Sequence, residues 1–200
     1  MAITFEKQSL SGRFPEIWRG ECKMLPGGFK PKQELHIGTV LRRATPVYVD
    51  FDTMSAAVCK TATVLDGSTT TKLRVAKGHY FTVGDSVAKH NGTATDVVTV
   101  KEVDRTNTAY DTITTSAAVT GIAKDDILIE AVKDGDAVKA AYTPNMIVGA
   151  DKQFDGKGLP TIDAAFEAVV LVPSLLFPIL PEWLTGVALT NNPNIIFIKQ

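Results

Sequence analysis

The chain has 200 residues, 44% of them hydrophobic, with 21 Lys and Arg residues against 22 Asp and Glu residues. This length can bury a core without disulfide bonds, and a formal charge of −1 gives no basic excess for binding nucleic acid. Cys22 and Cys59 lack the spacing of a zinc site or redox pair, so we expect free thiols.

Residues 1–34 predict an extended N-terminal arm. The first 14 residues include acidic and polar residues where a signal peptide needs an uninterrupted apolar run, so we do not expect export by that route. Prolines and glycines then interrupt any regular element. The arm carries the large apolar residues Phe14, Ile17, Trp18 and Phe29, which favour packing on its own domain or on a neighbouring subunit.

Residues 35–142 predict a β-rich body. Apolar and polar residues alternate with the period of two that is typical of half-buried strands. The alternation is clearest at residues 46–51, 72–76, 98–101 and 111–114. Turn-forming residues recur between these runs at intervals of about 8–12 residues, as in a sandwich or barrel. We expect a mainly β fold, with a small β-barrel or sandwich body and the barrel itself at about 74–138.

Residues 143–200 predict a short mixed C-terminal segment that packs on the body or on a neighbouring subunit. Apolar residues at 161–170 have helical spacing, yet the run at 168–172 also fits a buried strand, so we favour a short helix or turn that leads into a strand. Prolines exclude a long helix over 173–181. Residues 194–199 predict a terminal strand.

The stretch GHYFTVGDSVA at residues 78–88 allows a catalytic and a structural interpretation. His79 and Asp85 could form a base and its partner, but no nucleophile or orienting group is indicated nearby. We favour a strand that ends at His79-Tyr80-Phe81, a turn at Gly84-Asp85 and a new strand whose first core residue is Val87. The three histidines, His36, His79 and His90, are far apart in the sequence, and none is expected to bind a metal or act in catalysis.

Three other surface patterns also have structural interpretations. The carboxylates of Asp125, Asp126, Glu130, Asp134 and Asp136 could suggest calcium, but the spacing of a calcium loop is missing and turn chemistry explains them. The Asn91-Gly92-Thr93 sequon is also a strong hairpin-turn signal. A carbohydrate-binding platform of Tyr48, Tyr80, Tyr110 and Tyr142 is less favoured than packing, because these tyrosines are isolated within alternating runs.

Three blocks, residues 37–50, 77–87 and 191–200, resemble proteins described as head fibre or head decoration proteins of phages and prophages. The resemblance implies a non-enzymatic structural protein on the exterior of the virion capsid, made in the host cytoplasm. Its implied partners are other copies of itself, often in a trimer, and the major capsid protein, without cofactor, nucleic acid or membrane. A carbohydrate- or receptor-binding β module is the alternative, followed by a hydrolase on a β scaffold.

The most apolar window of the chain covers residues 169–184. It is too short and too rich in proline to span a bilayer as a helix. Left exposed, it would exceed the apolar patch that a soluble monomer usually tolerates. We therefore expect this window and the N-terminal arm to lie at an oligomer interface. The expected interface residues are Phe14, Trp18, Leu175, Leu176, Phe177, Ile179 and Trp183.

Overall fold

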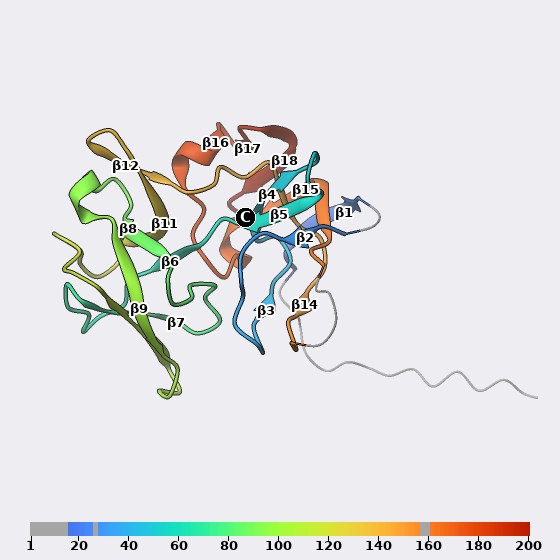
Figure 1. The fold of residues 1–200 in the computed structure, drawn as a ribbon. Helices are drawn as coiled ribbons and strands as arrows, with labels where there is room; N and C mark the ends of the chain where they lie inside the picture. Colours follow the sequence, from blue (N-terminus) through green and yellow to red (C-terminus); the bar gives the residue numbers. More distant parts are fainter. Residues whose placement is uncertain (1–15, 26–27, 157–160) are drawn as a thin grey trace, which may run out of the picture.

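The structure, a computed structural model, describes residues 16–25, 28–156 and 161–200. Within these ranges the chain is mainly β, as predicted, and its only helices are three single-turn 3-10 helices. None of the described helices is long and apolar enough to cross a membrane. Figure 1 shows two curled β layers side by side, with β7, β8, β9, β11 and β12 on the left and β1, β2, β4, β5 and β15 on the right.

The first sheet combines strands from the beginning and the end of the described chain. Its order is β16-β17-β18-β15-β13-β4-β5-β2, and β1 also pairs with β15. The strands are β1 (Trp18–Met24), β2 (Lys30–Pro31), β4 (Pro46–Asp50), β5 (Ser55–Val58), β13 (Met146–Val148), β15 (Ala164–Leu171), β16 (Leu184–Thr185), β17 (Ala188–Leu189) and β18 (Asn192–Ile198). Because β13 pairs with β4, and β15 with β13, the strands after residue 143 complete the sheet that β4 and β5 begin.

The second sheet is formed by one continuous stretch of the chain and curls into a half-barrel. Its order is β12-β11-β8-β9-β10-β7, and β6 pairs with β11. The strands are β6 (Thr61–Thr63), β7 (Lys72–Ala76), β8 (Ser86–Lys89), β9 (Val98–Asp104), β10 (Tyr110–Thr115), β11 (Ile127–Asp134) and β12 (Ala137–Ala140). A separate two-stranded sheet joins β3 (Val40–Leu41) to β14 (Lys152–Gln153).

The alternation in the sequence determines which side chains enter the core. In β7, Leu73 and Val75 are fully buried, while the residues between and beside them are more exposed. Ile113 of β10 is fully buried, and it lies opposite Leu73 in the ladder between β10 and β7. Side chains two residues apart therefore line the inside of the half-barrel, as the period of two predicts.

The short helix considered for residues 161–170 is wrong, because Ala164–Leu171 form strand β15. This strand pairs with β1, β13 and β18, and most of its residues are buried. A strand buried on both faces has apolar residues at nearly every position, so its spacing can match a helix by coincidence. The 3-10 helices η2 (Val172–Ser174) and η3 (Pro181–Trp183) follow it.

The described part of the predicted N-terminal arm is not free of regular elements as expected, because it supplies strands β1 and β2 of the first sheet. Trp18 of β1 is opposite Val170 of β15, and Phe29 is 2% exposed and forms an isolated bridge with Ile162. Phe14 lies outside the described residues.

A turn at Gly84 or at Gly92 would place that glycine in the left-handed region, and only one of the two is found there. Gly84 has φ 95°, as expected for a turn glycine, whereas Gly92 is not in the left-handed region. Its neighbour Asn91 has φ 60° instead, which is a conformation that asparagine tolerates. The connection from β8 to β9 is also longer than a two-residue hairpin, since it includes the 3-10 helix η1 (Ala94–Asp96).

Candidate functional site

The structure separates the two members of the possible catalytic pair. His79, Tyr80 and Phe81 are buried in the connection after β7, not at the end of a strand as predicted. Asp85 does form the expected turn with Gly84, and its Oδ2 accepts a hydrogen bond from the backbone N–H of Thr82 at 2.8 Å. Val87 is fully buried in the following strand, as predicted. The imidazole of His79 contacts Asp111 instead of Asp85.

His79 belongs to a group that we call the Asp111 cluster, formed by Lys77, His79, Arg105 and Asp111. The backbone N–H of Phe81 donates to His79 Nδ1 at 3.1 Å, and His79 Nε2 lies 3.1 Å from Arg105 Nη1. Nε2 is 3.3 Å from Asp111 Oδ2. Burial, followed by the positive charge of Arg105, lowers the pKa of His79 to about 4, so the ring is neutral at pH 7.

Asp111 is the shared acceptor of this cluster. Its carboxylate is 2% exposed and accepts hydrogen bonds from Lys77 Nζ at 2.7 Å and from Arg105 Nη1 at 3.0 Å. Lys77 Nζ also donates to the backbone carbonyl of Arg105 at 2.8 Å. Both nitrogens of His79 and both oxygens of Asp111 are therefore engaged within the chain, which suits a structural ion cluster better than a general base.

A second buried group, the Lys60 cluster, contains Gln33, Lys60, Asp85 and Glu130. The side chain of Lys60 is fully buried, and its Nζ lies 2.7 Å from Asp85 Oδ2 and 3.8 Å from Glu130 Oε2. Gln33 Nε2 donates to Glu130 Oε2 at 2.7 Å, and Gln33 Oε1 accepts from the backbone N–H of Val58 at 2.6 Å. The cluster thus connects β5 of the first sheet to β11 of the second.

Burial raises a pKa in the Lys60 cluster, whereas it lowers one in the Asp111 cluster. It raises the pKa of Glu130 to about 7, while the nearby charge of Lys60 opposes this shift and that of Asp85 adds to it. Sequence reasoning missed Lys60. The only signal was a lysine inside the apolar and small-residue run Val58-Cys59-Lys60-Thr61-Ala62, where a cation needs a buried partner.

The acidic residues considered for calcium are spread over different environments. Asp126 accepts from the backbone N–H of Ala123 and pairs with Lys89, whereas Glu130 belongs to the Lys60 cluster. Asp134 is exposed and lies 4.0 Å from Lys139. Turn and ion-pair chemistry therefore accounts for the carboxylates of Asp126, Glu130 and Asp134.

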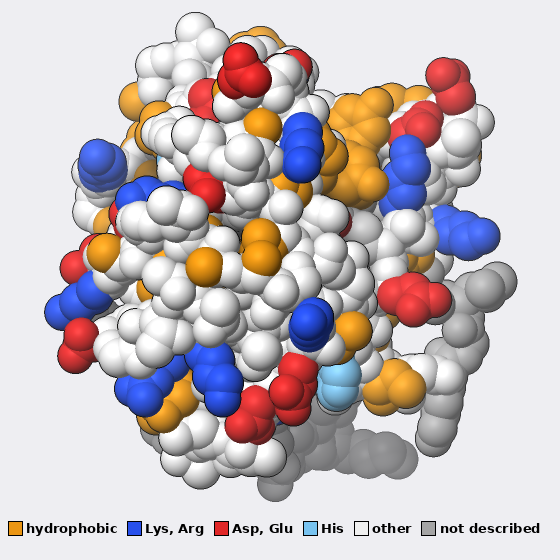
Figure 2. Space-filling model, turned by 60° about the vertical axis from the view of Figure 1, so that its left-hand side comes forward, with side chains coloured by type: hydrophobic (Ala, Val, Ile, Leu, Met, Phe, Trp, Pro, Cys, Tyr) orange, Lys and Arg blue, Asp and Glu red, His pale blue; other side chains and the backbone are white. Residues whose placement is uncertain are grey.

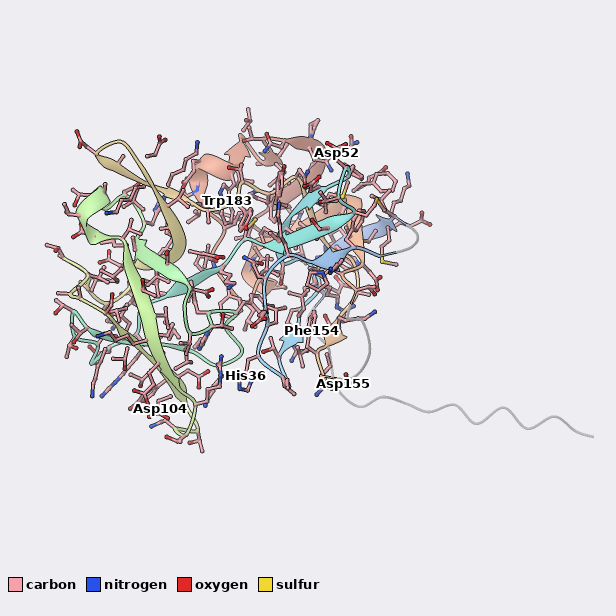
Figure 3. The ribbon with its side chains drawn as sticks, in the orientation of Figure 1. His36, Asp52, Asp104, Phe154, Asp155 and Trp183 are labelled. Carbon is pink, nitrogen blue, oxygen red and sulfur yellow. The ribbon has the colours of Figure 1, made fainter. Side chains whose placement is uncertain are left out.

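The other two histidines, His36 and His90, lie in different environments. His90 contacts Glu182 at 2.9 Å, and His36 is exposed in the connection before β3. In Figure 3 His36 lies at the lower edge of the molecule, between the end of β9 at Asp104 and the strand pair β3 and β14.

The four tyrosines do not form a common platform. Tyr80 is 2% exposed, and its hydroxyl accepts a hydrogen bond from the backbone N–H of Arg42. Tyr48 and Tyr142 stack on each other at 6.1 Å between ring centroids, and Tyr110 lies under the guanidinium group of Arg74. These contacts agree with the packing role that the sequence favoured.

The predicted interface residues fall into two groups. Leu176 is 49% exposed, and Trp18, Leu175, Phe177 and Ile179 are half-buried. Trp183, in contrast, is 2% exposed within the core of the single chain, so its ring cannot present a surface to a neighbouring subunit. The assignment of Trp183 to an interface is therefore wrong: its ring packs inside the chain although Pro181 and Glu182 before it are exposed.

A groove opens beside Leu176 where the two sheets meet. One cavity of about 490 Å³ is lined by Arg42, Arg43, Leu176 and Phe177, among others. A second cavity of about 510 Å³ shares Arg42 and Leu176 with the first and adds Lys77 and Arg105. We call these two neighbouring cavities together the arginine groove, defined by Arg42, Arg43, Lys77, Arg105, Leu176 and Phe177.

The arginine groove combines positive charge with apolar surface. The charged residues that line it are four cations (Arg42, Arg43, Lys77, Arg105) and two carboxylates (Asp111, Asp151). Elsewhere charges of both signs are interspersed, as Figure 2 shows for one face of the molecule. A local excess of two positive charges in a chain of net charge −1 favours an anionic and apolar partner.

The described residues contain no group of three or more His, Cys, Asp or Glu side chains placed to hold a metal ion. Comparison of the chain with protein-family models, curated proteins and solved structures finds no match.

Proposed function

We propose that this chain is a non-enzymatic structural protein of a phage virion, which decorates or projects from the capsid head. It acts as a homo-oligomer, with a trimer as the expected state, and binds the major capsid protein on the capsid exterior. The resemblance of residues 37–50, 77–87 and 191–200 to head fibre and head decoration proteins supports this role.

The observation that carries the proposal is the surface of the 172–179 loop. Leu176 is 49% exposed there, and half-buried apolar side chains at Leu175, Phe177 and Ile179 flank it. Ile17 lines the same cavity as this loop, so apolar groups from two distant segments of the chain meet at one surface. An apolar area that is bordered by charged residues is typical of a protein–protein contact.

The buried charged groups also suit a structural role. In both the Lys60 cluster and the Asp111 cluster, every charged side chain has a partner within the chain. Such clusters hold the sheets and the loops between strands together. Their charged groups already contact one another in the absence of any substrate.

Two measurements test the proposal. Light scattering on the full chain at micromolar concentration should give the mass of an oligomer, and Leu176→Asp should reduce that mass because it places a charge in an apolar contact. Val187→Asp is the control, since Val187 is 56% exposed but lies in the turn between β16 and β17. Negative-stain images of phage heads assembled with and without the chain should differ by density on the outer surface. A monomeric wild type together with unchanged heads would contradict the proposal.

A further inference from the structure

The turn between β4 and β5 is an exposed and acidic projection. Its four residues, Phe51, Asp52, Thr53 and Met54, which we call the 51–54 tip, are all exposed. Phe51 is 54% exposed and Met54 is 51% exposed, so two large apolar side chains face solvent in one turn. No hydrogen bond or ion pair of the Asp52 carboxylate occurs among the described residues.

The 51–54 tip is held in one shape before it meets any partner. Asp50 Oδ1 accepts hydrogen bonds from the backbone N–H groups of Asp52 at 3.0 Å and Thr53 at 3.3 Å. The ring of Phe51 packs edge-on against the buried ring of Phe29, with 5.9 Å between centroids. A preorganised projection loses little conformational entropy when it binds.

The tip and the arginine groove lie at opposite ends of the same hairpin. Pro46, the first residue of β4, and Cys59, which follows β5, both line the groove. The tip joins the other ends of these strands, about 14 Å away at the rise of an extended chain. Figure 3 shows Asp52 at the upper edge of the molecule and His36, which lines the 510 Å³ cavity, at the lower edge. The tip points away from its own groove, so only another molecule can bring a tip to it.

The two surfaces are complementary in charge and in apolar character. The groove has an excess of two positive charges and offers Leu176 and Phe177. Arg42 and Arg43 share the single carboxylate of Asp151, at 3.4 and 3.9 Å, so this pair of cations can take a second carboxylate. The tip offers Phe51 and Met54 together with the carboxylate of Asp52, while the carboxylate of Asp50 is already 3.7 Å from Lys32. A charged rim around apolar anchors is the usual composition of a specific contact.

We propose that the 51–54 tip of one copy inserts into the arginine groove of a second copy. Phe51 packs against Leu176 and Phe177, and Asp52 pairs with Arg42 or Arg43. This contact rests on the proposed function, because it requires that the chain self-associates. Each copy uses a different surface for its two neighbours, so the interface is heterologous and closes into a ring when the rotation between copies allows it.

Mixing two variants tests the contact. The double variant Phe51→Ser/Asp52→Lys removes the aromatic ring and the carboxylate of the tip and leaves the groove intact. Arg42→Glu reverses a charge in the groove and leaves the tip intact. Each variant alone should show association weakened at least about tenfold in sedimentation equilibrium. A 1:1 mixture should form a dimer, because the intact tip of one variant can still enter the intact groove of the other. An interface in which tip meets tip or groove meets groove would not be restored in this way.

The controls separate folding, self-association and the specific contact. Val187→Ser, in the turn between β16 and β17, with Asp134→Lys, at the end of β11, changes another exposed apolar residue and another exposed acidic residue and should leave the mass unchanged. Leu176→Ser serves as a second groove variant if Arg42→Glu unfolds the chain. Wild-type oligomers with a tip variant that assembles normally would overturn this inference and leave the proposed function standing. A wild type that stays monomeric would overturn both.

Discussion

The Lys60 cluster and the Asp111 cluster combine cations and carboxylates in opposite proportions. In the Lys60 cluster one cation faces the two carboxylates of Asp85 and Glu130, whereas in the Asp111 cluster one carboxylate faces the two cations Lys77 and Arg105. The pKa of Glu130 rises to about 7 and that of His79 falls to about 4. In the Lys60 cluster burial favours neutral Glu130, whose ionised form adds to the excess of negative charge. In the Asp111 cluster burial favours neutral His79, whose protonated form adds to the excess of positive charge.

The largest expected effect comes from removing the only cation of the Lys60 cluster. Lys60→Met should lower the free energy of unfolding by about 3–5 kcal/mol at pH 8, because two carboxylates then remain buried without a counter-charge. Urea unfolding monitored by circular dichroism measures the change. Lys139→Met is the control, since the Lys139 side chain is 62% exposed, and it should stay within about 0.5 kcal/mol of wild type. A loss below about 1 kcal/mol for Lys60→Met would mean that water reaches both carboxylates.

A pH series should show that the two clusters oppose each other. The pKa of Glu130 rises from 4.5 to about 7 on folding, so the folded state holds the extra proton and the stability from this group is lost as pH rises through that interval. The pKa of His79 falls from 6.5 to about 4, so the unfolded state holds the extra proton and stability rises with pH over about 4–6.5. Each contribution is about 3 kcal/mol, and the two nearly cancel between pH 4.5 and 6.5.

Single substitutions separate these two contributions. Glu130→Gln should leave a stability that rises with pH over about 4–6.5, and His79→Gln should leave one that falls over about 4.5–7. Thermal unfolding from pH 4 to pH 8 measures both slopes. Equal slopes in wild type and both variants would contradict the assignment of these pKa shifts.

A smaller effect is expected from the turn that positions Asp85 in the Lys60 cluster. Gly84 has φ 95°, so Gly84→Val forces a β-branched residue into the left-handed region and should cost about 1–3 kcal/mol. Chemical denaturation gives the value. Val83→Ala in the same turn is the control, because Val83 is 64% exposed and should have little effect. Stability within about 0.5 kcal/mol of wild type for Gly84→Val would show that the turn adapts without strain.

The smallest effect is expected from metal ions. The carboxylates of both clusters already have cationic partners, so stoichiometric Ca²⁺ or Zn²⁺ should leave the melting temperature unchanged. A site that binds only the folded chain would raise the melting temperature with metal concentration. Such a rise in differential scanning calorimetry would contradict the structural role assigned to these carboxylates.

Local patterns predicted much of the fold. The runs at 46–51, 72–76, 98–101, 111–114 and 194–199 all correspond to strands of the structure, because one face of each strand is more buried than the other. The turn at Gly84-Asp85 was also predictable, since glycine and aspartate have known roles in turns. Strand β15 was ambiguous because burial on both faces removes the period of two.

The partners within the charge clusters could not be predicted in this way. Gln33 and Glu130 are 97 positions apart, and Lys60 and Asp85 are 25 positions apart. The sequence pointed to His79 and Asp85 because they are close along the chain, but folding places His79 beside Asp111 and Asp85 beside Lys60. Such contacts depend on how distant segments are brought together in the folded chain, which local patterns do not report.

The position of β15 has a consequence for the order in which the protein forms. This strand pairs with β1, which lies near residue 20, and in parallel with β18, which ends at Ile198. The half-barrel, in contrast, needs only the strands from β6 to β12. During synthesis the half-barrel can therefore fold while the first sheet still lacks β13 and β15. More than a hundred residues must be made after β1 before β15, the strand that it pairs with, is present. Until then the apolar inner face of β4 and β5 is uncovered, and a chaperone that binds extended apolar segments would find its target there.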